Sequence, residues 1–323
     1  MNVFPLSRRS VVLAGAASLL GAPAFAQSDR AIRFILPVAT GSGVDTITRA
    51  TAPALTKALG HPVVIENQPG AGGVIGTNTM IKSPPDGFTL SVVSNNHVIY
   101  PAVLKSLPFD PVADITPIMV MGTTPLVLVV NPKLPANNAK ELVALMKARP
   151  GALNYASSGN GTILHLAAAM FLDEANVTAR HIPYKGVGPM VTDLIGGQVD
   201  MGVLALPSIQ AQLKGGTLRA IGTSSAKRLA AAPEIPTFAE QGLPSYVVEG
   251  WFAVVGPKGM APADVHRIHE AFVSAFNSPD VKETMAKQGN TITMSSPEQA
   301  QAFFKSELVK YAALVKKAGV EPQ

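Results

Sequence analysis

Short apolar runs alternate with longer amphipathic stretches along the first third of the chain. The apolar runs at 31–37, 62–66 and 88–94 have the length of buried strands, and the stretches at 44–59 and 74–82 carry apolar residues at helical spacing. The predicted order is therefore strand, helix, strand, helix, strand. Strands separated by helices of this length predict a parallel sheet with helices on both faces.

A second series of the same kind begins near residue 126. It predicts strands at 126–131, 153–157, 181–184, 199–204 and 218–224, and helices at 139–149, 163–173 and 189–195. A proline-rich stretch at 233–244 then precedes an apolar strand at 247–257 and three helical segments between 262 and 317.

The change of series predicts two domains within an α/β fold. The late strand and its helices need a sheet to dock on, so the C-terminal segment is expected to return to the N-terminal domain. The expected division is 27–125 plus 250–323 for the first domain and 126–249 for the second. Roughly 297 residues with 47% hydrophobic content suffice for two such cores.

Residues 1–26 have the pattern of a cleaved export signal. Paired arginines at 8–9 precede an apolar run at 11–20, and the tripeptide at 24–26 is a small-x-small cleavage site. The arginines suit either the general secretory or the twin-arginine route. The chain has no cysteine for a lipid anchor or a disulfide, and no later uncharged stretch reaches about 18 residues. We therefore expect a free periplasmic protein.

The charge argues against nucleic acid as a partner. The net charge of +5 falls to +3 when the two leader arginines leave with a segment that holds no acid, and the remaining basic residues form no cluster. A mild positive field favours anionic small molecules instead.

Small and polar residues gather where the predicted strands end, in loops at 37–45, 94–97, 157–162 and 184–189. In an open α/β sheet, ligands bind outside the carboxyl ends of the strands, where loops deliver backbone amides. The segment 157–162, SSGNGT, therefore has two interpretations: a cap for the helix that follows, or an anion site built from its amides and the helix dipole. Several such loops together favour the ligand interpretation.

Seven ordered segments extend this picture to nearly the whole chain after the leader. They are GHPVVIENQPGAGGVIGTN (60–78), PPDGFTL (84–90), LPFDPVADITPI (107–118), LNYASSGNGTILHL (153–166), HIPYKG (181–186), DLIGGQVDM (193–201) and TSSAKRLAAAPEIPTFAEQGLP (223–244). On these segments the chain resembles the extracytoplasmic receptors of tripartite tricarboxylate transporters, called Bug receptors.

The resemblance implies a two-domain periplasmic binding protein fold of the type II class, which closes over a small carboxylated solute in the cleft between its domains. The loops at 37–45 and 157–162 would hold one carboxylate, partly through ordered water, and the partners would be membrane permease subunits. We expect a monomer with no cofactor, metal or catalytic residue. With the strand-end loops, the candidate ligand-binding residues are Val38, Ala39, Gly41, Ser42, Asp45, Asn95, Asn96, Ser157, Ser158, Gly159, Asn160, Gly161, Thr162, His165, Tyr184 and Leu204.

Two places depart from the family pattern. The first loop has Val38 where members commonly carry Phe and Ser42 where they carry Gly, so it is narrower and has an added hydroxyl. Members often carry polar or acidic residues after the QVDM strand, whereas this chain has an apolar stretch at 202–206 that includes Leu204. An apolar wall argues against a ligand with a distal ammonium, because an unpaired buried charge is costly.

Several candidates also have a purely structural interpretation. Asp45 either orients the first loop or caps a helix. His165 either donates to a ligand or packs as a neutral ring. Tyr184 and Lys185 either reach the cleft or lie in solvent. Trp251, the only tryptophan, forms either cleft wall or hinge packing.

Catalytic signatures are weak. The sequence GTSSA at 222–226 lacks the second glycine of a nucleophile elbow, the G-x-G sites lack the third glycine of a dinucleotide fingerprint, and there is no Walker A lysine. His266 and His269 lie one helical turn apart without an evident third metal ligand. The sequence thus favours a transport receptor over a hydrolase. The other alternative is a sensory adaptor whose closed form engages a periplasmic sensor kinase.

Overall fold

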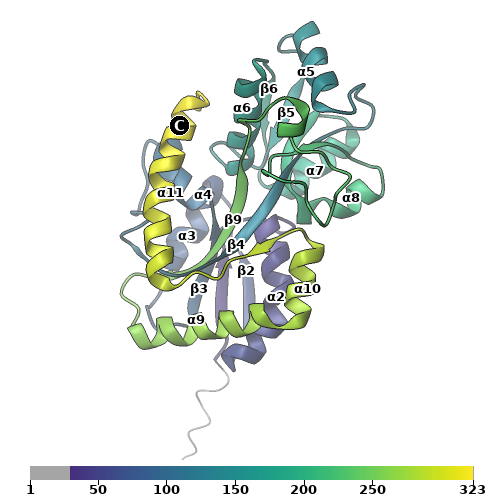
Figure 1. Ribbon diagram of the computed structural model, residues 1–323. Helices are drawn as coiled ribbons and strands as arrows, with labels where there is room; N and C mark the ends of the chain where they lie inside the picture. Colours follow the sequence, from purple (N-terminus) through teal and green to yellow (C-terminus); the bar gives the residue numbers. More distant parts are fainter. Residues whose placement is uncertain (1–29, 323) are drawn as a thin grey trace, which may run out of the picture.

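The computed structural model describes residues 30–322 as two α/β lobes that are joined by two long strands (Figure 1). The predicted export signal at 1–26 lies outside the described residues. Between residues 30 and 322, no helix combines the length and the apolar character that a membrane span requires.

The first lobe has a parallel sheet built from the N-terminal apolar runs. β1 (Ile32–Leu36) pairs in parallel with β2 (Val63–Asn67) on one side and with β3 (Thr89–Ser94) on the other. The connecting helices are α2 (Gly43–Leu59) and α3 (Val74–Ile81), the latter preceded by the short turn η2 (Ala71–Gly73). The predicted order of elements is confirmed in this part of the chain.

The second lobe contains the elements predicted for the second series. Its parallel strands are β5 (Asn154–Ser157), β6 (Arg180–Pro183) and β7 (Met201–Ala205). Its other elements are α5 (Ala139–Ala148), α6 (Ile163–Ala175), α7 (Val187–Gly196), η3 (Leu206–Ser208), α8 (Gln210–Lys214), β8 (Arg219–Thr223) and η4 (Ala239–Gln241).

The C-terminal segment supplies β9 (Glu249–Pro257) and three helices, as predicted. α9 (Pro262–Asn277) and α10 (Pro279–Lys287) pack against α2. The long helix α11 (Pro297–Lys317) lies along the side of the molecule in Figure 1, and the short strand β10 (Thr291–Ile292) precedes it.

Two elements begin where the sequence did not predict them. α4 (Asn96–Val103) begins inside the loop expected at 94–97, and β4 (Ile115–Val130) begins well before the strand expected at 126–131. α11 packs against both. In β4, threonines, prolines and a glycine interrupt the apolar positions, so the sequence does not show the period-two pattern of a strand.

The predicted parallel strands form two sets, β2-β1-β3 and β7-β5-β6, and β4 and β9 lie between them and run antiparallel to their neighbours. The strand order is β2-β1-β3-β9-β4-β7-β5-β6, and β8 and β10 also pair with β4. β3 pairs antiparallel with β9, and β4 pairs antiparallel with β7, β8 and β9. The chain enters the second lobe along β4 and returns along β9, so these two strands separate two parallel sets. A local strand and helix pattern does not record such long-range pairing.

β4 changes partners where it passes between the lobes. Residues 115–125 pair with β9, whereas residues 126–130 pair with β7 and β8. Each lobe has its own aromatic core: Phe34 packs edge-on against Phe272 in the first, and Phe171, Phe238 and Tyr246 pack together in the second. This arrangement brings the carboxyl ends of β1, β3, β5 and β6 and the helix starts that follow them to the region between the lobes (Figure 1).

Candidate functional site

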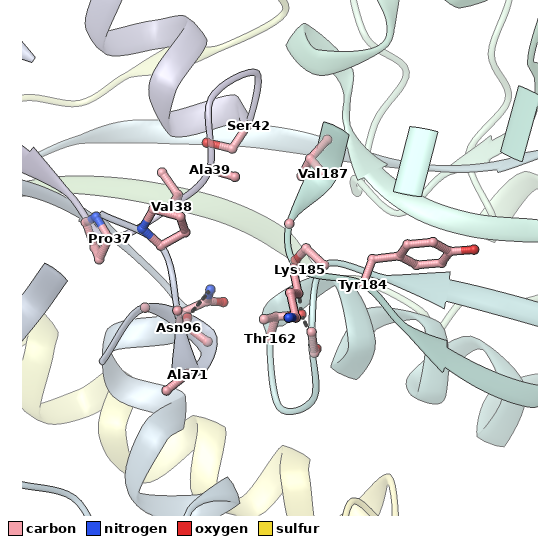
Figure 2. A pocket seen from close by; sticks show the side chains of 17 residues that line it. Pro37, Val38, Ala39, Ser42, Ala71, Asn96, Thr162, Tyr184, Lys185 and Val187 are labelled. Atoms are coloured by element: carbon pink, nitrogen blue, oxygen red, sulfur yellow. Dashed lines mark hydrogen bonds between the residues drawn. The ribbon is translucent and has the colours of Figure 1, made fainter. Parts of the chain in front are cut away.

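A cavity of about 450 Å³ lies between the lobes (Figure 2). The first lobe lines it with the loop after β1, the loop after β2 and the start of α4. The second lobe lines it with the loops after β5 and β6. The lining residues are Pro37, Val38, Ala39, Ser42, Pro69, Gly70, Ala71, Gly72, Gly73, Asn96, Ser158, Gly159, Thr162, Tyr184, Lys185, Gly186 and Val187.

Half of the sixteen predicted ligand-binding residues line this cavity. They are Val38, Ala39, Ser42, Asn96, Ser158, Gly159, Thr162 and Tyr184. The other eight predicted residues do not line it: Gly41, Asp45, Asn95, Ser157, Asn160, Gly161, His165 and Leu204.

Five helices begin at the cavity. The cap or first residue of each helix lines it: Ser42 for α2, Gly73 for α3, Asn96 for α4, Thr162 for α6 and Gly186 for α7. The first-turn amides of a helix have no intrahelical partner, and the helix dipole places partial positive charge at this end. Among the described residues that line the cavity, only Lys185 has a charged side chain, and it is also positive. The electrostatics therefore favour an anion.

Asp45 orients the loop after β1 and does not cap α2. Ser42 is the cap, since its side chain accepts a hydrogen bond from the Asp45 amide. The Asp45 carboxylate, only 2% exposed, accepts from the Gly41 amide at 2.9 Å and from Arg49 and Asn67 at the same distance. The carboxylate thereby fixes the turn that presents Val38 and Ser42 to the cavity.

The loop at 157–162 is held largely by its own hydrogen bonds. Thr162 caps α6 by accepting from the His165 amide, and its hydroxyl donates to the Gly159 carbonyl at 2.8 Å. The Ser157 hydroxyl also donates to the Gly159 carbonyl, at 3.0 Å. The capping interpretation is therefore confirmed, and the same loop faces the cavity through Ser158, Gly159 and Thr162.

A stack of three rings supports this loop from behind. The His165 and His181 rings lie 3.8 Å apart and nearly parallel, and Tyr155 stacks on His181 at 4.8 Å. His165 Nδ1 accepts from the Gly161 amide at 3.1 Å, so the ring is neutral in this arrangement. Burial lowers the pKa of both histidines to about 4, and repulsion from His181 adds to the effect at His165. His165 thus packs as a neutral ring, the second of its two interpretations.

Neighbouring residues Asn95 and Asn96 have different roles. The Asn96 side chain bridges the lobes, because Oδ1 accepts from the Ile163 amide at 2.8 Å while Nδ2 donates to the Gly72 carbonyl at 3.4 Å. Asn95 is fully buried, accepts from the Trp251 amide at 2.9 Å and donates to the Tyr311 hydroxyl. It therefore joins β9 and α11 at the base of the cleft.

Tyr184 and Leu204 lie differently from what the sequence suggested. The Tyr184 hydroxyl donates to Asp193 at 2.7 Å, and Figure 2 shows the ring directed away from the cavity. Burial, with Asp193 adding to the effect, raises the pKa of Tyr184 to about 12. Leu204 is fully buried in the core of the second lobe. Its neighbour Ala205 lies next to the cleft instead.

Three glycines lie where the two lobes meet. A Cβ atom on Gly43 would lie 2.8 Å from the Cβ atom of Ala205, and one on Gly186 would lie 2.6 Å from that of Ala39. Gly161 meets Val103 of α4 in the same way. This approach of the two lobes thus depends on the absence of side chains at these positions.

Sequence reasoning missed the segment 69–73 as part of the site. It follows β2 and precedes α3, so it occupies the same strand-end position as the loops that were predicted. Gly70, Gly72 and Gly73 all have positive φ angles, and a Cβ atom on Gly73 would lie 2.7 Å from the Pro37 carbonyl oxygen. The cluster of glycines after a strand was the signal that could have identified it.

Ser224 and Ser225, in the sequence that resembles a nucleophile elbow, are buried, and the Ser224 hydroxyl donates to the Val248 carbonyl. Between residues 30 and 322, no three His, Asp or Glu residues come together in a way that could hold a metal ion.

Solved structures define the class of protein to which this fold and cleft belong. The chain superimposes on the periplasmic binding protein BugD with a TM-score of 0.87 and 30% identity, over 91% of this chain and 99% of BugD. It superimposes on R. palustris Rpa4515 with adipate with a TM-score of 0.88 and 28% identity, over 91% of this chain and 99% of that chain. The fold is thus the two-domain periplasmic binding protein fold, as predicted.

Sequence comparison gives the family within this class. Residues 47–320 match the tripartite tricarboxylate transporter family receptor, TctC. Protein BugT of Bordetella pertussis is 36% identical over 294 residues, which are 90% of this chain and 90% of BugT. The chain belongs to the TctC family of Bug-type receptors, and the resemblance found in its sequence is confirmed.

Proposed function

We propose that this chain is the extracytoplasmic receptor that captures a small carboxylated solute and delivers it to the permease subunits of a tripartite tricarboxylate-type transporter. The observation that carries the proposal is the convergence of five helix N-termini and Lys185 on one cavity. Amides and a lysine in this arrangement suit a carboxylate. The solved relative that is described with adipate supports the same ligand chemistry.

The receptor acts in the periplasm as a monomer, after loss of residues 1–26. Its first domain consists of residues 27–125 and 250–323, and its second domain consists of residues 126–249. The change of partners along β4 at residues 125–126 supports the first crossing, and the start of β9 at Glu249 supports the second. Ligand binding closes these domains, as is usual for hinged receptors.

The cavity binds its solute without transforming it. Its described lining residues include no carboxylate, imidazole or thiol that would serve as a general base. A panel of esters tests this directly, since turnover above the buffer rate would contradict a pure receptor.

A ligand screen tests the proposal. The protein is purified from the periplasm, unfolded and refolded to remove any bound solute, and then titrated with mono-, di- and tricarboxylates, aromatic acids and neutral vitamins. A carboxylate is expected to raise the melting temperature, because it binds only the folded state. Lys185→Gln should weaken this binding about tenfold or more, since hydrogen bonds to charged groups contribute about 1.5–3 kcal/mol.

Lys214→Gln is the matched control, because Lys214 is exposed and lies outside the cavity. Uptake of the same solute is then measured in a strain that lacks the gene. Lost uptake supports delivery to a transporter, whereas unchanged uptake supports a sensing role. Stabilisation by neutral compounds alone, or equal effects of the two lysine variants, would contradict the carboxylate proposal.

A further inference from the structure

A small inner chamber of about 70 Å³ adjoins the cavity. It shares five lining residues with the cavity: Val38, Ser42, Asn96, Ser158 and Val187. Its other walls come from both lobes and from the strands between them, and include Gly43, Val44, Thr124, Ala205, Ser208 and Trp251. A water molecule needs about 10–15 Å³ of cavity volume. The chamber therefore has room for a group of a few non-hydrogen atoms.

Two hydroxyl groups in the chamber wall lack hydrogen-bond partners. Thr124 is 7% exposed, and its Oγ1 atom is buried without a partner among the described residues. The Oγ atom of Ser208 is also buried and has no hydrogen-bond partner among the described residues. Buried polar groups in proteins are nearly always paired, and each hydroxyl can both donate and accept a hydrogen bond. The pair is therefore suited to a bound group that offers both functions.

The chamber has no charged wall. Its described lining residues include no Asp, Glu, Lys, Arg or His. Two carboxylates stand directly behind the wall: Asp45 follows Val44 in α2, and Glu307 accepts from the Trp251 indole at 2.9 Å. Each is ion-paired on its outer side, with Arg49 and with a lysine of α11. No positive side chain of the described wall therefore compensates an anion placed in the chamber, and burying an uncompensated charge is costly.

The helix starts that adjoin the chamber are also partly used. The carboxylate of Asp45 already lies in the first turn of α2, where it offsets the dipole. The first amide of α6, on Ile163, donates to Asn96. By contrast, Lys185 and the start of α3 face only the larger cavity, whereas the start of α7 lines both spaces through Val187. The positive side chain of the described lining therefore belongs to the cavity and not to the chamber.

We propose that the chamber receives the neutral, hydrogen-bonding end of the ligand, a hydroxyl, carbonyl or carboxamide group that pairs with Thr124 and Ser208. The ligand carboxylate stays in the larger cavity beside Lys185. The preferred solutes are thus short monocarboxylates with a neutral polar distal group rather than dicarboxylates. This inference rests on the proposed function, because it assumes that the cavity binds a carboxylate.

Matched probes test the inference by calorimetry at pH 7. The four-carbon set is succinamate, 4-hydroxybutyrate, succinate and butyrate, and a six-carbon set has the same four end groups. In one of the two sets, the amide and hydroxyl probes should bind at least tenfold more tightly than the dicarboxylate. Thr124→Val and Ser208→Ala should each weaken these two probes by up to about tenfold, as expected for a lost neutral hydrogen bond. The alkyl monocarboxylate should be unaffected.

Thr123→Val is the control, because adjacent residues of a strand point to opposite faces and Thr123 does not line the chamber. If Thr124→Val does not fold, Ser208→Ala by itself tests the inference. Tightest binding of the dicarboxylate, or equal losses for all probes in the two variants, would overturn the inference and leave the receptor function intact. If no carboxylate binds at all, the proposed function fails and the inference fails with it.

Discussion

Replacing Gly43 with alanine tests how tightly the two lobes meet. Gly43 is the first residue of α2, and a Cβ atom at this position would lie 2.8 Å from the Cβ atom of Ala205 across the cleft. Carbon atoms in contact lie about 3.5–4.0 Å apart. Alanine at 43 therefore pushes the second lobe away, and we expect Gly43→Ala to weaken ligand binding by the closed form.

The cost of overpacking a well-packed contact sets the size of the effect. Overpacking such a contact costs about 1–3 kcal/mol, which corresponds to an affinity loss of about 5- to 150-fold. The unliganded protein can relieve the contact by opening. Alanine is also a better helix former than glycine. The free energy of unfolding without ligand should therefore stay the same or rise slightly, while affinity falls.

Calorimetry and urea denaturation measure the two quantities separately. Gly188→Ala is the matched control, because Gly188 lies in the first turn of α7 and a Cβ atom there meets nothing within 4 Å. Ala205→Gly, added to Gly43→Ala, removes the opposing methyl group and should restore affinity. Wild-type affinity in Gly43→Ala, or no recovery in the double variant, would refute the reasoning.

Three further predictions concern the residues around the cleft. Ser158→Ala should lower carboxylate affinity by up to about tenfold without changing the melting temperature, because it removes one hydroxyl from the cavity wall; calorimetry with an unchanged affinity would contradict this. Asn95→Ala should lower the free energy of unfolding by about 1–3 kcal/mol in urea, since it leaves the Trp251 amide and its other partners unpaired; an unchanged midpoint would speak against that role. Because the folded pKa of His165 and His181 lies near 4, below the ordinary value of 6.5, the unfolded chain binds more protons between these values, and the free energy of unfolding should fall as the pH is lowered from about 6.5 to 4. Replacing both histidines with glutamine should flatten this slope only in part, because a third buried histidine on α4 has a similarly lowered pKa; an unaltered slope would show that the stacked pair does not titrate in this range.

The sequence by itself determined the local elements and the family. Helical spacing of apolar residues in the stretch at 44–59 and short apolar runs such as 31–37 depend only on neighbouring residues, so the pattern predicted these helices and strands correctly. The caps at Ser42 and Thr162 act within one turn of their helices, which is why small polar residues at strand ends marked the helix starts.

Tertiary structure decided which of these residues reach the cleft. Asn95 and Asn96 are alike in the sequence. Asn95 is buried in hydrogen bonds with β9 and α11, whereas Asn96 bridges the two lobes. Leu204 and Ala205 differ in the same way, because successive residues of β7 point to opposite faces.

Local sequence patterns also could not predict the distances between residues across the cleft. A bulky residue at Gly161 would be expected from the sequence to block only a ligand, yet this position meets Val103 of the other lobe. The antiparallel β4 and β9 also follow from how the chain crosses between the lobes. Periodicity and capping are set within a few residues of the chain, whereas side-chain direction at a cleft and contacts between lobes depend on segments that are far apart in sequence and packed together only in the folded protein.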